Sequence, residues 1–198
     1  MWDQRYGEEG FAYGVEPNDF LREQVGAFAP GAAVLCLAEG EGRNAVYLAE
    51  RGCEVTAVDL SPVGLAKAEK LAAERGASIT TVAADLSAYD LGEARWDGVV
   101  SVWAHVPPAV RGPLHRRVVR ALKPGGVLLL EAYTPKQLEH GTGGPPKAEL
   151  MMTLAGLREE LAGLEIELGR EVEREIHEGR YHDGMSATVQ LLARKPAA

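Results

Sequence analysis

The fold is decided by residues 34–59, which read VLCLAEGEGRNAVYLAERGCEVTAVD. An apolar segment at 34–37 is followed by a glycine-containing turn at 38–42 and a helical segment at 43–50, which Gly52 ends. A second apolar segment at 54–58 then leads to Asp59. We therefore predict a strand, a helix and a second strand, which is the unit from which parallel sheets are built.

The turn and the end of the second strand have the residue types that a nucleotide-like ligand needs. Gly40 and Gly42 lack a Cβ, so a ligand can approach the backbone closely, while the start of the helix offers unpaired N–H groups. Asp59 is placed to accept hydrogen bonds from two ribose hydroxyls. The alternative is an ordinary glycine-containing corner between a strand and a helix, because short glycine patterns are common. The acid that follows favours the ligand.

These residues carry a family resemblance. Residues 34–44 and 55–60 resemble motif I and the acidic second-strand end of class I S-adenosylmethionine-dependent methyltransferases. GEGRNAVYLAERG (40–52) and MWDQRYGEEGFAYGVEPNDFL (1–21) look like the small bacterial branch labelled tellurite-resistance or thiopurine-type methyltransferases. The resemblance covers nearly the whole chain, and its most specific part ends near Glu131.

The chain departs from the family pattern at two positions. Cys36 stands where the family usually has an aspartate in the first strand, and Ala38 stands where it has its first glycine. The missing acid raises the question of how the methionine amino group of the cofactor is held. Glu39 and Glu41 are both candidates for its replacement.

The resemblance implies S-adenosylmethionine as the cofactor and S-adenosylhomocysteine as the product. The methionine end of the cofactor is expected at the backbone of Gly40 and Gly42 and at Arg43 and Asn44, the ribose at Asp59, and the adenine at Asp85 and Leu86. Asp85 alone can also be explained as a helix cap for residues 87–91. The full set of expected cofactor-binding residues is Tyr13, Glu39, Gly40, Gly42, Arg43, Asn44, Asp59, Leu60, Asp85, Leu86 and Ser101.

Residues of the acceptor side are expected in the N-terminal segment and around the loop 134–148. Residues 1–30 are rich in aromatic side chains, and the resemblance implies that they form a cap over the cofactor edge; packing without ligand contact is the alternative. The long loop 134–148 is expected to shape the acceptor pocket. The expected substrate-binding residues are Arg5, Tyr6, His105 and Tyr133. His140 and Lys136, within that loop, are more simply explained as solvated residues.

His105 is the only titratable group in the segment 101–106, which follows the fourth expected strand. This position lies at the carboxyl edge, where open α/β sheets bind ligands. The ordinary pKa of histidine suits a general base, so His105 is the candidate catalytic residue. A hydrogen-bonded packing histidine is the alternative.

The remaining pattern indicates an α/β fold: a doubly wound, mostly parallel, seven-stranded sheet of the Rossmann-like methyltransferase type, in a single domain spanning 1–198. The expected strands after the first two are 79–83, 96–103, 127–133, 165–176 and 187–193. The last two are expected to be antiparallel and joined by a turn at 179–185, in which Arg180 and His182 would be exposed.

Composition limits the classes of partner. The chain has 198 residues, 46% of them apolar, and a net charge of −8, which disfavours nucleic acid as a partner. No apolar run approaches the roughly 20 residues that span a bilayer, and no secretory signal begins the chain, so no membrane association and a cytoplasmic location are expected. Cys36 and Cys53 fit buried reduced thiols, and no metal site is expected. A monomer or a homodimer is expected.

These observations favour an enzyme that transfers a methyl group from S-adenosylmethionine to a small-molecule acceptor, such as a chalcogen oxyanion or a thiol. One alternative is a module that binds S-adenosylmethionine or S-adenosylhomocysteine without turnover. A nicotinamide-dependent oxidoreductase is disfavoured because the turn AEGEGR lacks the third glycine of a Gly-x-Gly-x-x-Gly motif.

Overall fold

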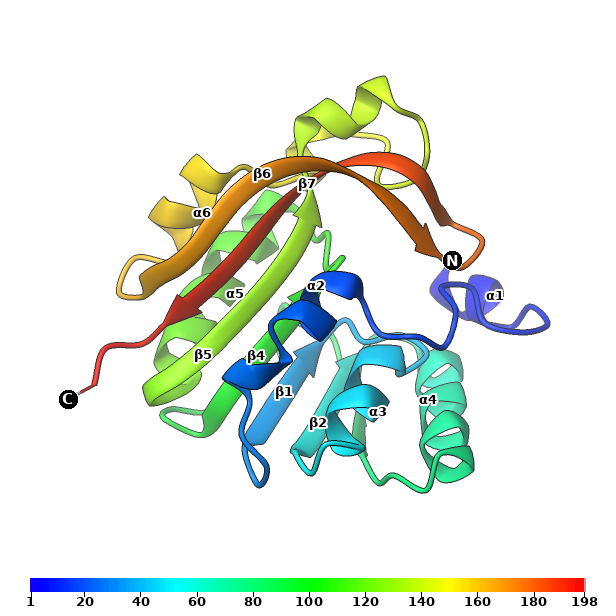
Figure 1. Ribbon diagram of the computed structural model, residues 1–198, viewed down its shortest axis with the longest axis horizontal. Helices are drawn as coiled ribbons and strands as arrows, with labels where there is room; N and C mark the ends of the chain where they lie inside the picture. The colour runs from blue at the N-terminus through cyan, green and yellow to red at the C-terminus, as the bar shows by residue number, and fades with distance from the viewer. Residues whose placement is uncertain (198) are drawn as a thin grey trace.

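A central sheet of seven strands organises the molecule, and the computed structural model describes residues 1–197 of it (Figure 1). The strand order is β3-β2-β1-β4-β5-β7-β6. The strands are β1 (Ala33–Leu37), β2 (Glu54–Asp59), β3 (Thr80–Ala83), β4 (Trp96–Val102), β5 (Leu122–Tyr133), β6 (Glu165–Glu178) and β7 (His182–Arg194). β7 runs antiparallel to both β5 and β6, whereas the other pairings are parallel. The predicted fold class is confirmed.

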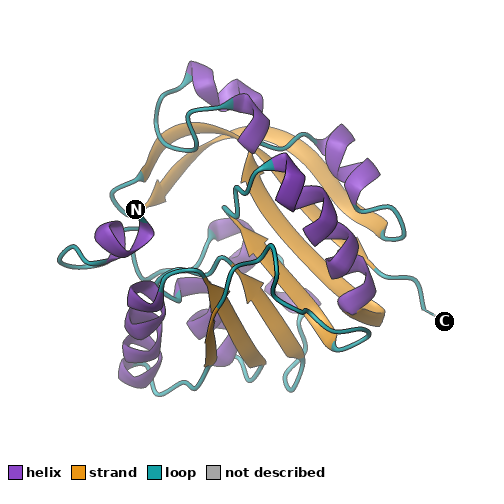
Figure 2. Ribbon diagram, turned by 180° about the vertical axis from the view of Figure 1, so that it is seen from behind, coloured by secondary structure: helices purple, strands orange, loops and turns teal. Residues whose placement is uncertain are grey.

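Helices cover both faces of this sheet. They are α1 (Trp2–Tyr6), α2 (Asp19–Glu23), α3 (Arg43–Ala49), α4 (Pro62–Glu74), α5 (Pro108–Ala121) and α6 (Leu154–Glu160), with single turns η1 (Val25–Ala27), η2 (Pro135–Glu139) and η3 (Ala148–Leu150). α5 and α6 pack on one face, as Figure 2 shows, and α2, η1 and α3 on the other (Figure 1). No helix within residues 1–197 is both long and apolar enough to cross a bilayer.

β1 is apolar throughout because it lies between two strands in the sheet and because helices cover the sheet on both faces. Val34 pairs with Val55 on one side and with Gly98 on the other, and the side chains from Val34 to Leu37 are all at most 2% exposed. Cys36, in the same strand, is a free, fully buried thiol, as is Cys53 nearby at 7% exposure.

The C-terminal hairpin is longer than the sequence pattern predicts. The turn spans residues 179–181 and not the expected 179–185, because Glu178 of β6 already pairs with His182 of β7. β6 and β7 curve together over the carboxyl edge of the sheet, and their tip reaches the N-terminal segment (Figure 1). β5 likewise begins at Leu122, five residues before the expected start at Val127.

The N-terminal segment packs against the body of the protein. α1 contacts α4, and a Cβ added at Gly64 in α4 would lie 2.8 Å from the ring of Tyr6. Farther along, the side chain of Asn18 caps α2 by accepting a hydrogen bond from the N–H of Leu21. Phe20 and Leu21 are fully buried in the core between α2 and the sheet.

Candidate functional site

A cavity of about 490 Å³ lies at the carboxyl ends of β1 to β4. The N-terminal segment, the loop 143–146 and the tip of the β6–β7 hairpin complete its wall. Most of the predicted residues line it: Arg5, Tyr6, Tyr13, Glu39, Arg43, Asn44, Asp59, Leu60, Asp85, Leu86 and His105. Gly40, Gly42, Ser101 and Tyr133 are not among the lining residues.

Glu39, one of the two candidates to replace the missing strand acid, lies beside the start of α3. Its Oε1 accepts hydrogen bonds from the backbone N–H groups of Asn44 (3.0 Å) and Ala45 (2.8 Å), at the start of α3. The side chain is partly buried in the cavity wall. Burial raises its pKa to about 7, although these hydrogen bonds and the Arg43 guanidinium oppose the rise. Burial raises the pKa of the Cys36 thiol well above its ordinary value, and the nearby Glu39 adds to this rise.

Glu41, the other candidate for the missing acid, holds the N-terminal segment instead. Its Oε2 accepts a hydrogen bond of 2.7 Å from the N–H of Ala12, and its Oε1 forms an ion pair of 3.0 Å with Lys67 of α4. Lys67 also donates to the carbonyls of Glu8 and Gly10. The two glutamates of the turn therefore have different roles, and only Glu39 has no side-chain partner of opposite charge.

The space beside Gly40 and Gly42 is filled by other residues of the protein and is not part of the cavity. Gly42 has a φ of 90°, and a Cβ there would lie 2.4 Å from the Cβ of Ala68, so α4 packs directly on the turn. A Cβ at Gly40, where φ is 62°, would lie 2.6 Å from the hydroxyl of Tyr6. Both positions need the conformational freedom of glycine for packing.

Asp59, at the end of β2, is fixed by the turn that precedes α3. Its Oδ2 accepts from the N–H of Gly40 and its Oδ1 from the N–H of Ser61, both at 2.8 Å. Burial raises the pKa of this carboxyl, and the two N–H donors work in the opposite direction. Because a carboxylate oxygen accepts more than one hydrogen bond, Asp59 can still receive two hydroxyl donors from a ligand.

Asp85 and Leu86 lie beyond β3 on the same wall. Asp85 is exposed, and its Oδ1 accepts a 2.7 Å hydrogen bond from the N–H of Ser87, which lowers the pKa of the carboxyl. This is the local cap that the alternative interpretation expects, but Asp85 also faces the cavity. Leu86 is buried there, at 7% exposure.

Arg43 and Asn44 belong to a buried polar network that joins distant parts of the chain. The guanidinium of Arg43 donates to Glu178 Oε2 at 2.6 Å, and the Oδ1 of Asn44 accepts from the N–H of Asn18 at 2.9 Å. Asn18 Nδ2 in turn donates to both Glu131 and Glu178. Although burial alone would raise the pKa of Glu178, Arg43 lowers it to about 2. Glu178 is therefore an ionised group inside the protein.

His105 uses both of its ring nitrogens to hold backbone. Nε2 accepts a 2.9 Å hydrogen bond from the N–H of Tyr133, so Nδ1 is the protonated nitrogen and donates to the carbonyl of Trp103 at 3.1 Å. Burial lowers the pKa of this imidazole to about 4. Neither nitrogen is left to take a proton from a substrate, so this geometry fits the packing alternative better than the predicted general base.

His182 lies inside the cavity wall, which corrects the expectation that it is an exposed turn residue. It is 6% exposed and lines the cavity, because the ladder of the hairpin continues to Glu178 and His182 and its tip curls inward. Arg180 remains exposed. The only sequence signal for His182 is the continued alternation of polar residues through the predicted turn.

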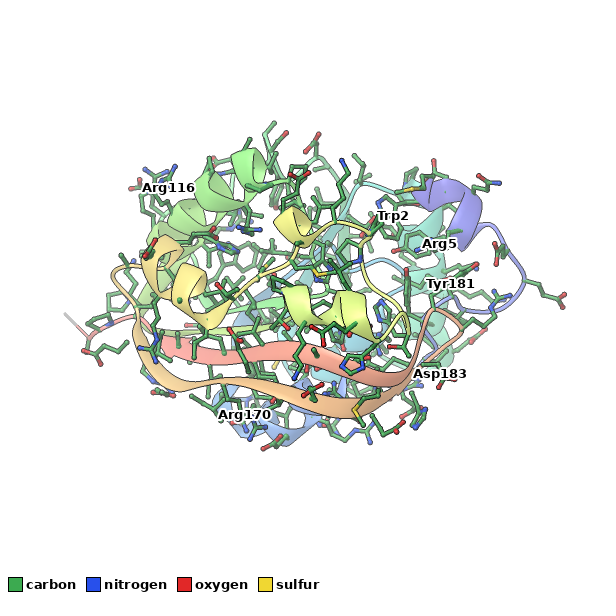
Figure 3. The ribbon with its side chains drawn as sticks, turned by 90° about the horizontal axis from the view of Figure 1, so that it is seen from above. Trp2, Arg5, Arg116, Arg170, Tyr181 and Asp183 are labelled. Atoms are coloured by element: carbon green, nitrogen blue, oxygen red, sulfur yellow. The ribbon has the colours of Figure 1, made fainter. Side chains whose placement is uncertain are left out.

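Aromatic rings surround the end of the cavity that His182 occupies. Trp103, a residue with a φ of 58°, stacks on Tyr133 with ring centroids 4.5 Å apart, and Tyr133 stacks on His105. Tyr133 thus packs behind Trp103 and His105, which line the cavity. The guanidinium of Arg5 lies 4.4 Å from the ring centroid of Tyr181 and 5.2 Å from that of Trp2. Figure 3 labels these three residues, which lie near one another.

Comparisons with known proteins agree with this architecture. Residues 34–126 match the family model described as a methyltransferase domain. TehB from Haemophilus influenzae superposes with a TM-score of 0.75 at 20% identity, over 98% of this chain and 65% of that one. The chain has the seven-stranded methyltransferase fold. The same fold is found in the N-methyltransferase NodS from Bradyrhizobium japonicum WM9 in complex with S-adenosylhomocysteine (TM-score 0.67, 17% identity, 90% of this chain and 84% of that one).

A curated relative provides a closer sequence match over part of the chain. The protein named uncharacterized methyltransferase sll0829, from Synechocystis, is 38% identical over 106 residues, which are 52% of this chain and 48% of that protein. The chain thus spans about half the length of this relative. The match to the methyltransferase domain model at 34–126 includes Glu39, Asp59 and Asp85.

The residues of the cavity fit S-adenosylmethionine. About 490 Å³ is within the range of small-ligand and cofactor sites. Asp59 offers acceptors for the hydroxyls of a ribose, and Glu39 offers an acidic oxygen for an ammonium group. Asp85 and Leu86 line the same cavity.

Proposed function

We propose that this protein is an S-adenosylmethionine-dependent methyltransferase that acts on a small molecule. The observation that carries the proposal is the convergence of Glu39, Asp59 and Asp85, from the ends of three neighbouring strands, on one cavity. The methyltransferase domain match at 34–126 contains all three residues. The bound cofactor would supply an electrophilic methyl group on a positively charged sulfur.

Each part of the cofactor would be held by different residues. Glu39 would receive the ammonium of the methionine part, Asp59 the two ribose hydroxyls, and Asp85 with Leu86 the adenine. Arg43 is paired with Glu178, so it would act mainly by fixing the start of α3. Gly40, Gly42 and Ser101 would support the site without lining it.

The chain would accelerate transfer mainly by alignment and by excluding water. The N-terminal segment 1–30 and the loop 134–148 are proposed to cover the cofactor and to shape the acceptor pocket within a single domain. Holding two reactants in the correct geometry lowers a barrier by roughly 7 to 11 kcal/mol. Glu41 holds the N-terminal segment in place, because it accepts a hydrogen bond from the N–H of Ala12 and forms an ion pair with Lys67 of α4.

The acceptor is proposed to be a small molecule, with a thiol or a chalcogen oxyanion as the finer candidates. The resemblance to tellurite-resistance and thiopurine-type methyltransferases supports these two. The net charge of −8 supports the exclusion of nucleic acid. The protein is proposed to act in the cytoplasm, as a monomer or a homodimer.

The test is a measurement of S-adenosylhomocysteine formation with S-adenosylmethionine and each of a panel of acceptors, including tellurite, selenite and small thiols. Acceptor-dependent formation of the product supports an enzyme. Tight binding of S-adenosylmethionine with no acceptor able to raise product formation would instead support a binding module without turnover. Binding of a nicotinamide dinucleotide in place of S-adenosylmethionine would support the oxidoreductase alternative.

A further inference from the structure

His182 is a buried histidine in the cavity wall with no hydrogen-bond partner among residues 1–197. Its Nδ1 is enclosed and unpaired, and lies 4.0 Å from Oε2 of Glu178. The ring is held by aromatic neighbours: Tyr13 at 4.6 Å, Trp103 at 5.0 Å and Tyr133 at 5.4 Å between centroids. Because Nδ1 is enclosed while the ring lines the cavity, Nε2 is the nitrogen that can meet a ligand.

Glu178 determines how this imidazole is oriented. Its carboxylate is fixed by Arg43 at 2.6 Å, by the indole N–H of Trp103 at 2.8 Å and by the amide of Asn18 at 2.9 Å. An ionised carboxylate next to Nδ1 favours the tautomer that carries its proton on Nδ1. The lone pair of Nε2, the nitrogen that is not enclosed, is then available to a molecule in the cavity.

The charged and titratable groups around His182 keep it neutral. Burial lowers the pKa of its imidazole to about 3, Glu178 opposes this, and Arg43, His105 and Arg5 add to the lowering. Tyr13 and Tyr133 complete the surroundings, and burial raises the pKa of both. His182 is therefore in its proton-accepting form across the physiological pH range.

We propose that His182, positioned by Glu178, is the general base for methyl transfer to a neutral acceptor that still carries its proton on sulfur or oxygen. This rests on the proposed function. A lone pair of the acceptor forms the new bond to the methyl carbon while the carbon–sulfur bond of the sulfonium breaks and its electrons remain on sulfur. The acceptor's proton moves to Nε2 of His182.

The charge balance of this step favours the arrangement. The sulfonium loses one positive charge as the imidazole gains one, so the net charge in the cavity is unchanged. The new imidazolium forms 4.0 Å from the Glu178 carboxylate, which partly offsets the cost of placing a charge there. The rings of Trp103, Tyr13 and Tyr181 line the cavity and offer apolar surface for the body of the acceptor.

The tautomer of His182 tests the geometry without an acceptor. Two-bond ¹H–¹⁵N correlation spectra of the ¹⁵N-labelled protein at pH 7 are expected to show one neutral histidine ring with its proton on Nδ1 that disappears in His182→Gln. His105 is expected to have the same tautomer, so its own assignment from His105→Gln is needed. A proton on Nε2 of His182, or a charged ring at this pH, would overturn the proposal.

The chemistry is tested with three probes: phenylmethanethiol and phenol, which keep their protons at pH 7.5, and 4-nitrobenzenethiol, which is already a thiolate. His182→Gln is expected to lower the rate of methylation of the protonated probes about 100-fold and that of the thiolate less than about tenfold. His177→Gln, an exposed histidine of the same hairpin, is the matched control and is expected to behave as the wild type. Equal losses on both kinds of probe would overturn the base role.

The proposed function and this inference fail in different ways. If the wild type does not bind S-adenosylhomocysteine in calorimetry, the proposed function fails. If it binds S-adenosylhomocysteine but methylates only 4-nitrobenzenethiol, or none of the three probes, the inference fails and the proposed cofactor site stands. His182→Gln is expected to bind S-adenosylhomocysteine within about threefold of the wild type, because His182 is not among the residues proposed to hold the cofactor.

Discussion

The carboxylate of Glu39 accepts a hydrogen bond of 2.8 Å from the backbone N–H of Ala45, at the first turn of α3. Cys36 of β1 lies close to Glu39, because Glu39 contributes to the raised pKa of its thiol. Because burial raises the pKa of Glu39 to about 7, its charge depends on pH in the neutral range.

Cofactor binding is therefore expected to depend on pH through Glu39. An ammonium group attracts the ionised carboxylate, so affinity for S-adenosylhomocysteine should increase about tenfold from pH 5.5 to pH 7. Glu39→Gln keeps the hydrogen bonds to the N–H groups of α3 and should show weaker, nearly pH-independent binding over this interval. Calorimetry at several pH values measures both.

The double substitution Cys36→Asp with Glu39→Cys is the sharper comparison, because it returns the acid to the strand. This variant is expected to bind S-adenosylhomocysteine at pH 7.5 better than Glu39→Gln. If Glu39→Gln binds as tightly as the wild type and has the same pH dependence, Glu39 is not the residue that meets the ammonium group.

Asp59→Ala is expected to weaken the binding of S-adenosylhomocysteine at least about tenfold, because it removes two charge-assisted hydrogen bonds to the ribose. Glu54→Ala, at the exposed start of the same strand, serves as the control and should bind as the wild type does. Circular dichroism melting curves establish that both variants are folded. Unchanged affinity in a folded Asp59→Ala protein would refute the ribose role.

Gly42→Ala is expected to lower the free energy of unfolding by about 3 kcal/mol, because its Cβ would lie 2.4 Å from that of Ala68 and its φ is 90°. Gly76→Ala separates these two causes. Gly76 has a φ of 67° but open space around it, so its replacement should cost only about 1 kcal/mol. Urea unfolding measures the difference, and equal losses would show that packing against α4 is not the constraint.

The Glu178 carboxylate is expected to make stability depend on acid pH. Arg43 holds its pKa at about 2, below the ordinary value of 4.5, so its contribution is present above pH 4.5 and is lost as pH falls toward 2. Glu178→Gln should lower the free energy of unfolding at pH 7 by about 3 kcal/mol and reduce the loss between pH 4.5 and 2. Exposed Glu175→Gln is the control, expected to match the wild type.

The sheet and the cofactor side of the site were predictable because both follow from local pattern. Apolar segments that each lead into a helix indicate parallel strands, and the carboxyl ends of parallel strands share one edge. Glu39, Asp59, Asp85 and His105 therefore had to come near one another, and all four line the cavity.

The acceptor side depends on contacts between residues far apart in the sequence, which local patterns do not contain. The curvature of the long β6–β7 hairpin brings His182 beside Tyr13 and Trp103, whereas the alternation of its residues predicts only a strand or a turn. The packing of Tyr6 over Gly40 is likewise invisible before α1 is placed.

The central claim, that the edge formed by β1 to β3 holds S-adenosylmethionine, is tested most directly by titrating S-adenosylhomocysteine into the purified protein in a calorimeter. We expect one site per chain with a dissociation constant below about 1 mM, and weaker binding by Asp59→Ala. Absence of binding to the folded wild type at millimolar S-adenosylhomocysteine would contradict it.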